Sequence, residues 1–290
     1  MGGVIVTQQP PRRGCVALRP LGLAEILDGS FRVIRRNPGA TLGLSAVLAV
    51  IRVAVTAGLQ LGAYRFLSTV QLELVGTLLI SAALGTVLTG LLTLVVTQDV
   101  LGVRISTREV LTRLRGRAWA LLGLALVITV LESLALLPLL VLGVWLWGLW
   151  AVAVPVLMVE RSTVRGALSR SRRLVSGLWW RVWGIRALGF LLASLLGALV
   201  TVPFILLASL VTGSGFTATG VNSGVPVAYV LIISVGSVLS STLTSPIRAG
   251  IDALLYLDLR MRREGLDIVL HSQASPVRPV APPAGARSAF

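Results

Sequence analysis

The chain has 290 residues, of which 55% are hydrophobic and only 13% are charged, and its mean hydropathy is +0.90. This is too little polar surface to coat a water-soluble globule, so the composition excludes an ordinary soluble domain and predicts an integral membrane protein. A formal charge of +15 would suit a nucleic-acid-binding domain, but here the charge must lie at the ends of apolar segments.

The reactive residue types in the chain limit the enzyme classes and metal sites that it can form. All 26 basic residues are arginine, and the lack of lysine excludes a Walker A phosphate loop and a Schiff-base lysine. His271 is the only histidine and Cys15 the only cysteine, so one chain supplies neither a multi-histidine metal site nor a disulfide. We therefore expect no catalytic residue, no cofactor, no bound metal and no enzymatic activity.

The chain divides into a membrane domain with a tail at each end. Residues 1–19 and 271–290 carry proline with little apolar periodicity, which predicts disordered tails around a membrane domain at residues 20–270. A polar, arginine-bearing segment precedes the first apolar run, so no cleavable signal peptide is expected.

Six apolar segments have about the 20 residues that a helix needs to cross a bilayer. They lie near Ala40–Gly62, Val75–Thr97, Ala118–Leu136, Leu139–Val159, Val182–Leu206 and Pro226–Ser245. The third and fourth segments adjoin, so a tight turn at Leu137 and Pro138 must fold them back on each other. The sequence thus predicts an all-α membrane protein with six transmembrane helices arranged as three hairpins.

The arginines set the orientation, because cytoplasmic loops carry the basic excess. The segments before the first span, between spans 2 and 3, between spans 4 and 5, and after span 6 hold 24 of the 26 arginines. Arg65 lies in an opposite loop and Arg52 lies deep within a span. We expect a multi-pass protein of the bacterial inner (plasma) membrane with both termini in the cytoplasm.

An amphipathic segment precedes each predicted hairpin. In residues 21–39, the apolar residues Leu23, Ile26, Leu27, Phe31 and Ile34 share one face, and Asn37 with Pro38 stops the helix. Residues 105–117, ISTREVLTRLRGR, form a shorter second example. The third is residues 164–179. We expect all three to be amphipathic helices lying in the membrane interface.

The third of these segments suggests contact with anionic lipid. Arginines occupy the polar face of the predicted helix, and tryptophans follow where span 5 enters the membrane, as amphipathic rings do at headgroup level. These candidate lipid-interface residues are Arg165, Arg170, Arg172, Arg173, Trp179, Trp180 and Trp183. A nucleic-acid site is the alternative for such a basic stretch, but it would more naturally use a soluble basic domain.

Three stretches resemble a known family. RPLGLAEILDGSFRVIRRNPG, SRRLVSGLWWRVWGIR and SPIRAGIDALLYLDLRMRREGLD are similar to bacterial, largely actinobacterial, six-span proteins related to the glycerophosphoryl diester phosphodiesterase membrane domain. The resemblance implies a membrane module, joined in some relatives to a separate soluble phosphodiesterase barrel. No soluble stretch here is long enough to hold that barrel, so its activity is not expected of this chain.

One stretch imitates a catalytic motif. Glu25, Asp28 and Gly29 are similar to the start of the phosphatidyltransferase pattern D-x-x-D-G-x-x-A-R, but Arg32 comes one place early and the second half of the motif is missing. We interpret these acids as part of the polar face of a surface helix, where negative charge near the N-terminus complements the helix dipole.

The sequence therefore predicts a non-catalytic membrane module that contacts anionic lipid at the cytoplasmic face and has a membrane-protein partner or a second copy as a further possible contact. The alternative is a transporter of a small or lipid-like substrate, suggested by Pro246 at the end of span 6 and by charges within spans. The other interpretation of Pro246 is that span 6 continues past the edge of the membrane as a helix, with Asp258 and Arg262, and Arg260 and Glu264, at i, i+4 spacing.

Small residues recur at four-residue spacing in the last two spans. They are Gly189, Ala193 and Gly197 in span 5, and Gly236, Ser240 and Thr244 in span 6. Such stripes let helices approach closely, within the bundle or in a dimer.

Two charges lie deep within predicted spans. Arg52 and Glu132 each stand 14 positions after the predicted start of an outward-running span, at Pro38 and Ala118 respectively. A lone charge at the centre of a membrane helix is costly, so we expect an ion pair between the two that docks the first hairpin on the second. The alternatives are that Arg52 extends towards the interface or that Glu132 stays hydrated near Pro138.

Overall fold

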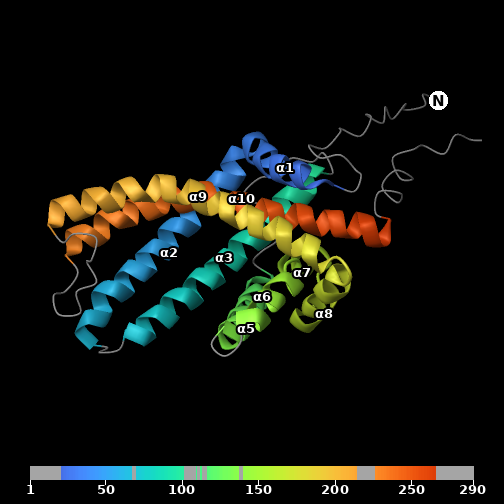
Figure 1. The fold of residues 1–290 in the computed structure, drawn as a ribbon, viewed down its shortest axis with the longest axis horizontal. Coiled ribbons are helices and arrows are strands. Elements are labelled where there is room, and N and C mark those ends of the chain that lie inside the picture. Colours follow the sequence, from blue (N-terminus) through green and yellow to red (C-terminus); the bar gives the residue numbers. More distant parts are fainter. Residues whose placement is uncertain are drawn as a thin grey trace, which may run out of the picture.

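The computed structural model describes residues 21–66, 70–100, 109, 112, 116–136, 140–213 and 226–265, and in these ranges the chain is helical without strands (Figure 1). The helices are α1 (Leu23–Arg36), α2 (Pro38–Phe66), α3 (Val70–Val100), α5 (Ala118–Leu136), α6 (Leu140–Leu149), α7 (Ala153–Val159), α8 (Val164–Val175), α9 (Trp179–Thr212) and α10 (Val227–Glu264). The all-α prediction is confirmed for this part of the chain. Both predicted tails and most of residues 105–117 lie outside the described residues.

Four stretches of the described chain are long and apolar enough to cross a membrane. They are Pro38–Gly58, Leu142–Val159, Trp179–Thr212 and Val227–Glu264. Two shorter apolar helices, Ala82–Gln98 and Ala118–Leu131, fall at the remaining predicted spans. The described chain thus has four candidate membrane-spanning helices, which is consistent with a membrane protein, and the count of six remains a prediction.

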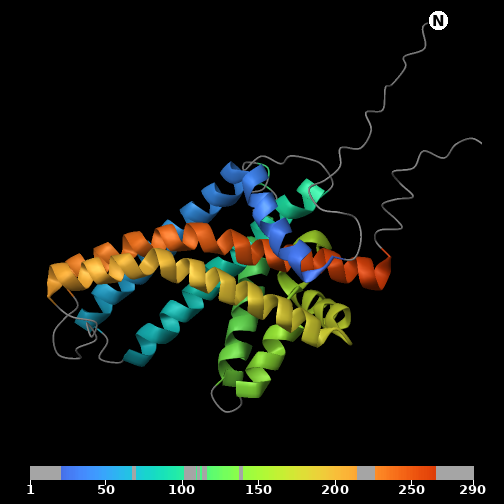
Figure 2. The same ribbon diagram turned by 45° about the horizontal axis from the view of Figure 1, so that its top comes forward.

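The helices pair in chain order and spread from a common centre. Contacts join α2 to α3, α5 to α6 and α9 to α10, and α10 also packs on α1, α2 and α3. Both ribbon views show α9 and α10 side by side along their length, while the other two pairs diverge from them (Figures 1 and 2). The common centre is the C-terminal half of α10.

Small residues bring α9 and α10 together, as the sequence suggests. Gly197 faces Ser240, whose hydroxyl donates to the Gly197 carbonyl at 3.2 Å. A Cβ added at Gly236 would lie 2.7 Å from the Cβ of Phe204. The stripes of glycine, alanine, serine and threonine therefore serve the contact between two helices of one chain.

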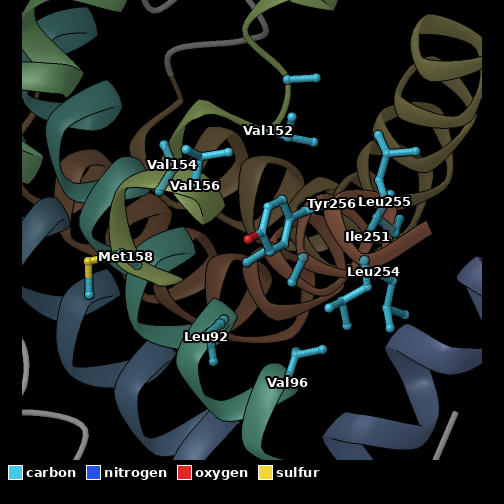
Figure 3. Close-up of a cluster of buried hydrophobic side chains, with 14 of the residues drawn as sticks. Leu92, Val96, Val152, Val154, Val156, Met158, Ile251, Leu254, Leu255 and Tyr256 are labelled. Atoms are coloured by element: carbon cyan, nitrogen blue, oxygen red, sulfur yellow. The ribbon is translucent and has the colours of Figure 1, made fainter. Parts of the chain in front are cut away.

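Helix α10 runs through Pro246 without a break and continues to Glu264, well past the predicted membrane boundary at Ser245. Most residues of its second half are buried. Tyr256 is fully buried there, packed among apolar residues of α3, α7 and α10 (Figure 3). The extension predicted at the edge of the membrane is thus the core of the protein.

Helix α1 packs on this extension rather than standing alone. Ile26 and Val33 are buried, and Ser30 lies so close to α10 that a Cβ at Gly250 would be 3.1 Å from its Cβ. Leu23, which the sequence placed on the apolar face, is 41% exposed. The helix ends at Arg36 as predicted, and Pro38 opens α2 in the position where proline is tolerated.

The fourth predicted span is broken. A turn at residues 150–152 separates α6 from α7, so the segment is not one continuous helix. Carbonyls of α6 near this turn accept side-chain donors. The Trp145 carbonyl accepts from the Trp179 indole at 3.1 Å, and the Leu149 carbonyl accepts from the Ser171 hydroxyl at 2.9 Å. Such satisfaction is what a helix end within a membrane requires.

The packing of α9 against α10 predicts a position-specific cost for added volume. Gly236→Ala should destabilise the protein by roughly 1–3 kcal/mol, because the new methyl group meets the Cβ of Phe204 and the helices must separate. Gly184→Ala on α9, where nothing lies within 4 Å, should be neutral or stabilising. Denaturation of the purified protein in detergent measures both. Equal effects at the two positions would contradict the close contact.

Candidate functional site

The predicted lipid-interface residues gather where α8 meets α9. Helix α8 begins at Val164 because Thr163 caps it, its hydroxyl accepting from the Gly166 amide at 3.2 Å. Ala167, Ser171 and Leu174 are buried against the rest of the protein. The apolar side of α8 therefore packs on the rest of the protein. The sequence predicted that this side would insert into lipid, and the structure shows packing on protein instead.

The opposite side of α8 carries the exposed charge. Arg165, Arg172 and Arg173 are all exposed, and no ion pair is recorded for them among the described residues. Because the buried side fixes the rotation of the helix, these three guanidinium groups are held facing outward. We name Arg165, Arg172 and Arg173 together the basic face of α8.

Arg170 differs from its neighbours on the same helix. Its Nε lies 3.0 Å from a carboxylate oxygen of Glu160, and its Nη2 bonds Glu264 at the end of α10. Burial on its own would lower the pKa of Arg170, but hydrogen bonds and charge from Glu160 and Glu264 raise it above its ordinary value. Arg170 is thus engaged within the protein, where it joins α8 to α10.

The three predicted tryptophans form one cluster at the start of α9. The ring centroids of Trp179 and Trp180 lie 4.7 Å apart in an edge-to-face arrangement, and Trp183 stacks on Trp179 at 6.2 Å. Trp180 is 78% exposed and follows the basic face of α8 along the chain. Trp179 instead donates its indole N–H to the end of α6, so only part of the cluster is directed outward.

A buried acid on α10 connects that helix with the start of α9 and with Leu21, which precedes α1. Asp258 is fully buried, accepts from the Leu21 amide at 2.7 Å and pairs with Arg262 at 2.9 Å and Arg181 at 3.4 Å. Both arginines also donate to the Leu21 carbonyl. The spacing of Asp258 and Arg262 predicted their pairing, but nothing in the sequence marked Arg181 or Leu21 as partners.

Of the predicted ion pair of Arg52 and Glu132, the structure describes the side chain of Arg52 alone. Arg52 is partly buried on α2, and its Nη2 donates to the hydroxyl of Ser241 on α10. The side chain of Glu132 lies outside the described residues, so the ion pair remains a prediction. The recorded contact shows that Arg52 reaches α10.

The described arrangement offers the basic face of α8 and the exposed ring of Trp180 as binding surfaces. Among the described residues, no group of three or more histidine, cysteine or acidic side chains is placed to hold a metal ion. Comparison with known protein families, with characterised proteins and with solved structures finds no match to this chain. The resemblance to the phosphodiesterase membrane domain therefore stays a prediction from the residues alone.

The Asp258 contacts predict a strong dependence of stability on one carboxylate. Asp258→Asn should destabilise the protein by about 3–5 kcal/mol, because it leaves Arg181 and Arg262 partly buried without their counter-charge. Asp28→Asn is the matched control, since Asp28 pairs with Arg32 at i, i+4 spacing but both side chains are more than half exposed. The control should cost about 0–1 kcal/mol. Similar losses for both variants, measured by denaturation in detergent, would show that the Asp258 cluster is not structural.

Proposed function

We propose that this protein is a non-catalytic module of the bacterial inner membrane that contacts anionic lipid through the basic face of α8. The observation that carries the proposal is the fixed outward direction of Arg165, Arg172 and Arg173, which are followed along the chain by the exposed ring of Trp180. Arginine near an anionic lipid surface contributes about 1 kcal/mol per residue, and tryptophan prefers the headgroup level.

The proposed topology has six spans in three hairpins with both ends of the chain in the cytoplasm. Its support is the distribution of arginine. Arginines occur on α8, at the start of α9 and in the C-terminal part of α10, whereas residues 187–212 of α9 and 227–247 of α10 carry no charge. In this orientation the basic face of α8 meets the cytoplasmic leaflet, which carries the anionic lipids. A protein partner or second copy would dock from the same side or within the bilayer.

Transport of a small or lipid-like substrate is the second candidate. The observation that favours it is the turn at residues 150–152 within an otherwise apolar segment, because transporters commonly place broken helices beside the substrate. A substrate-dependent flux in reconstituted vesicles would distinguish transport from a static module.

The lipid contact can be measured by quenching of tryptophan emission in bilayers that contain brominated lipids. Brominated phosphatidylglycerol should quench the reconstituted protein more strongly than brominated phosphatidylcholine, because the basic face of α8 enriches anionic lipid around Trp180. The preference should fall with added salt, which screens exposed charges. Trp180→Phe should remove most of the preferential quenching, since Trp180 is the exposed ring of the cluster.

Matched variants distinguish the effect of the positive charge on the three arginines from the effect of the guanidinium shape. Replacement of Arg165, Arg172 and Arg173 by glutamine should abolish the preference, whereas replacement of all three by lysine should keep it, because a surface potential does not require the guanidinium fork. If the wild-type protein is quenched equally by the two lipids, the proposed lipid contact is wrong.

A further inference from the structure

A cavity of about 560 Å³ lies between the helix pairs, remote from the basic face of α8. Residues of α2, α3, α5, α6, α7, α9 and α10 line it, so every recorded helix pair contributes a wall. Its volume falls in the range of about 300–1,000 Å³ that is typical of small-molecule sites.

The charged lining of this cavity is mostly positive. Arg52, Arg186 and Arg248 line it, against Asp252 as the acidic residue among the described lining. Arginine keeps its charge in proteins, so a cavity within apolar helices cannot discharge these groups by deprotonation. Each must find a counter-charge, water or a polar partner.

Asp252 forms an ion pair with one of these three arginines, Arg186. The Nε of Arg186 lies 2.9 Å from one carboxylate oxygen of Asp252, and its Nη1 donates to the Trp147 carbonyl at 2.5 Å. The guanidinium also lies over the Trp147 ring, 4.5 Å from its centroid. Arg186 is therefore satisfied within the protein and closes the end of α6.

Arg52 and Arg248 have neutral partners in the described part of the chain. Arg52 donates to the Ser241 hydroxyl, and Arg248 donates to the Ser194 hydroxyl at 3.1 Å while lying over the Phe190 ring. Glu132, whose side chain is not described, belongs to α5 one turn beyond the cavity residue Ile128 and would balance Arg52 at most. Asp252 also attracts Arg248 electrostatically, but it is shared with Arg186, so the arginines on the recorded lining still outnumber the acids after that pairing.

The two arginines lie at similar depth. Arg248 reaches Ser194 on α9, and α9 runs beside α10 with Gly189 near Ile251 and Gly197 near Ser240. This register places the Arg248 guanidinium near the level of Ser245, which is about one helical turn, or roughly 6 Å, from Ser241. One anion between them can accept hydrogen bonds from both guanidinium groups, with hydroxyls of α10 beside it.

The cavity opens towards the side of the helix bundle. Arg248 is exposed, and Phe190, which also lines the cavity, is 53% exposed. The neighbouring surface of α9 is apolar, with Leu191 54% and Leu195 60% exposed. A molecule whose anionic end occupies the cavity can therefore extend an apolar part along α9.

We propose that this cavity binds the phosphate-bearing headgroup of an anionic lipid, with Arg248 and Arg52 as its cationic ligands and its acyl chains passing Phe190. Phosphate matches the guanidinium fork, because two parallel N–H donors meet two oxygens. The site is separate from the basic face of α8: the latter attracts lipid in bulk, whereas the cavity holds one molecule.

Native mass spectrometry of the full-length protein in detergent tests the site with phosphatidylglycerol and phosphatidylcholine of the same acyl chains. One phosphatidylglycerol should stay bound in preference to phosphatidylcholine. Arg248→Gln should weaken that binding roughly 10- to 100-fold, the factor expected when one or two charge-assisted hydrogen bonds are lost. Arg248→Lys should fall between the two. The variant with glutamine at Arg165, Arg172 and Arg173 should bind as tightly as the wild-type protein.

The proposal is wrong if Arg248→Gln binds phosphatidylglycerol as well as the wild type does. It is also wrong if excess inorganic phosphate displaces the lipid completely, because the ligand would then be a free anion. A photoreactive phosphatidylglycerol on the wild-type chain decides the matter even if the variants fail to fold. Crosslinks near Phe190 and Ser245 support the site, and crosslinks confined to the outer surfaces of α2 or α8 contradict it.

Discussion

The carboxylate of Asp258 is the interaction on which the described fold depends. It is fully buried, and it accepts from the Leu21 amide and pairs with Arg181 and Arg262. A buried charge is tolerated when all its hydrogen-bonding and charged partners are in place. The fold therefore requires α1, the first turn of α9 and the end of α10 to pack together around Asp258. The position of α8 follows, because Arg170 bonds Glu264 on the same part of α10.

Much of the local structure could be predicted from the sequence. The apolar runs located the helices, Pro38 and Thr163 mark real helix starts, and the i, i+4 spacing of Asp258 with Arg262 and of Arg260 with Glu264 gave true pairs. These features depend on residues within a turn or two of one another. The glycine stripes of α9 and α10 likewise predicted a close contact, since a missing side chain leaves room for a helix.

The missed features depend on partners distant in sequence. Amphipathic periodicity in α1 and α8 predicted faces that would meet lipid, but the same pattern suits packing on protein, and both helices do that. Uniformly apolar residues gave no sign of the turn at residues 150–152. The turn is made possible by Trp179, Ser171 and Arg186, which satisfy carbonyls of α6 from later in the chain. With arginine as its only base, the sequence also could not show which arginine meets which acid.

Three groups of arginines in the described chain suggest a division of roles. Arg181, Arg186 and Arg170 are paired within the protein and hold helices together. The basic face of α8 is directed outward, and Arg52 and Arg248 line a cavity with hydroxyl partners. Arginine thus serves in helix pairing, in the proposed attraction of lipid to the surface and in the proposed ligand binding. The burial of each arginine and its distance from the nearest acid distinguish these roles.

The central claim is that the second half of α10 organises the protein, and hydrogen exchange of the full-length chain in lipid nanodiscs tests it most directly. Backbone amides from Ile247 to Leu259 should exchange as slowly as those of the apolar half of α10, because they lie in the buried core beyond the predicted membrane boundary. If this segment exchanges as fast as the exposed side of α8, the extension of α10 is a surface helix and the account of the fold is wrong.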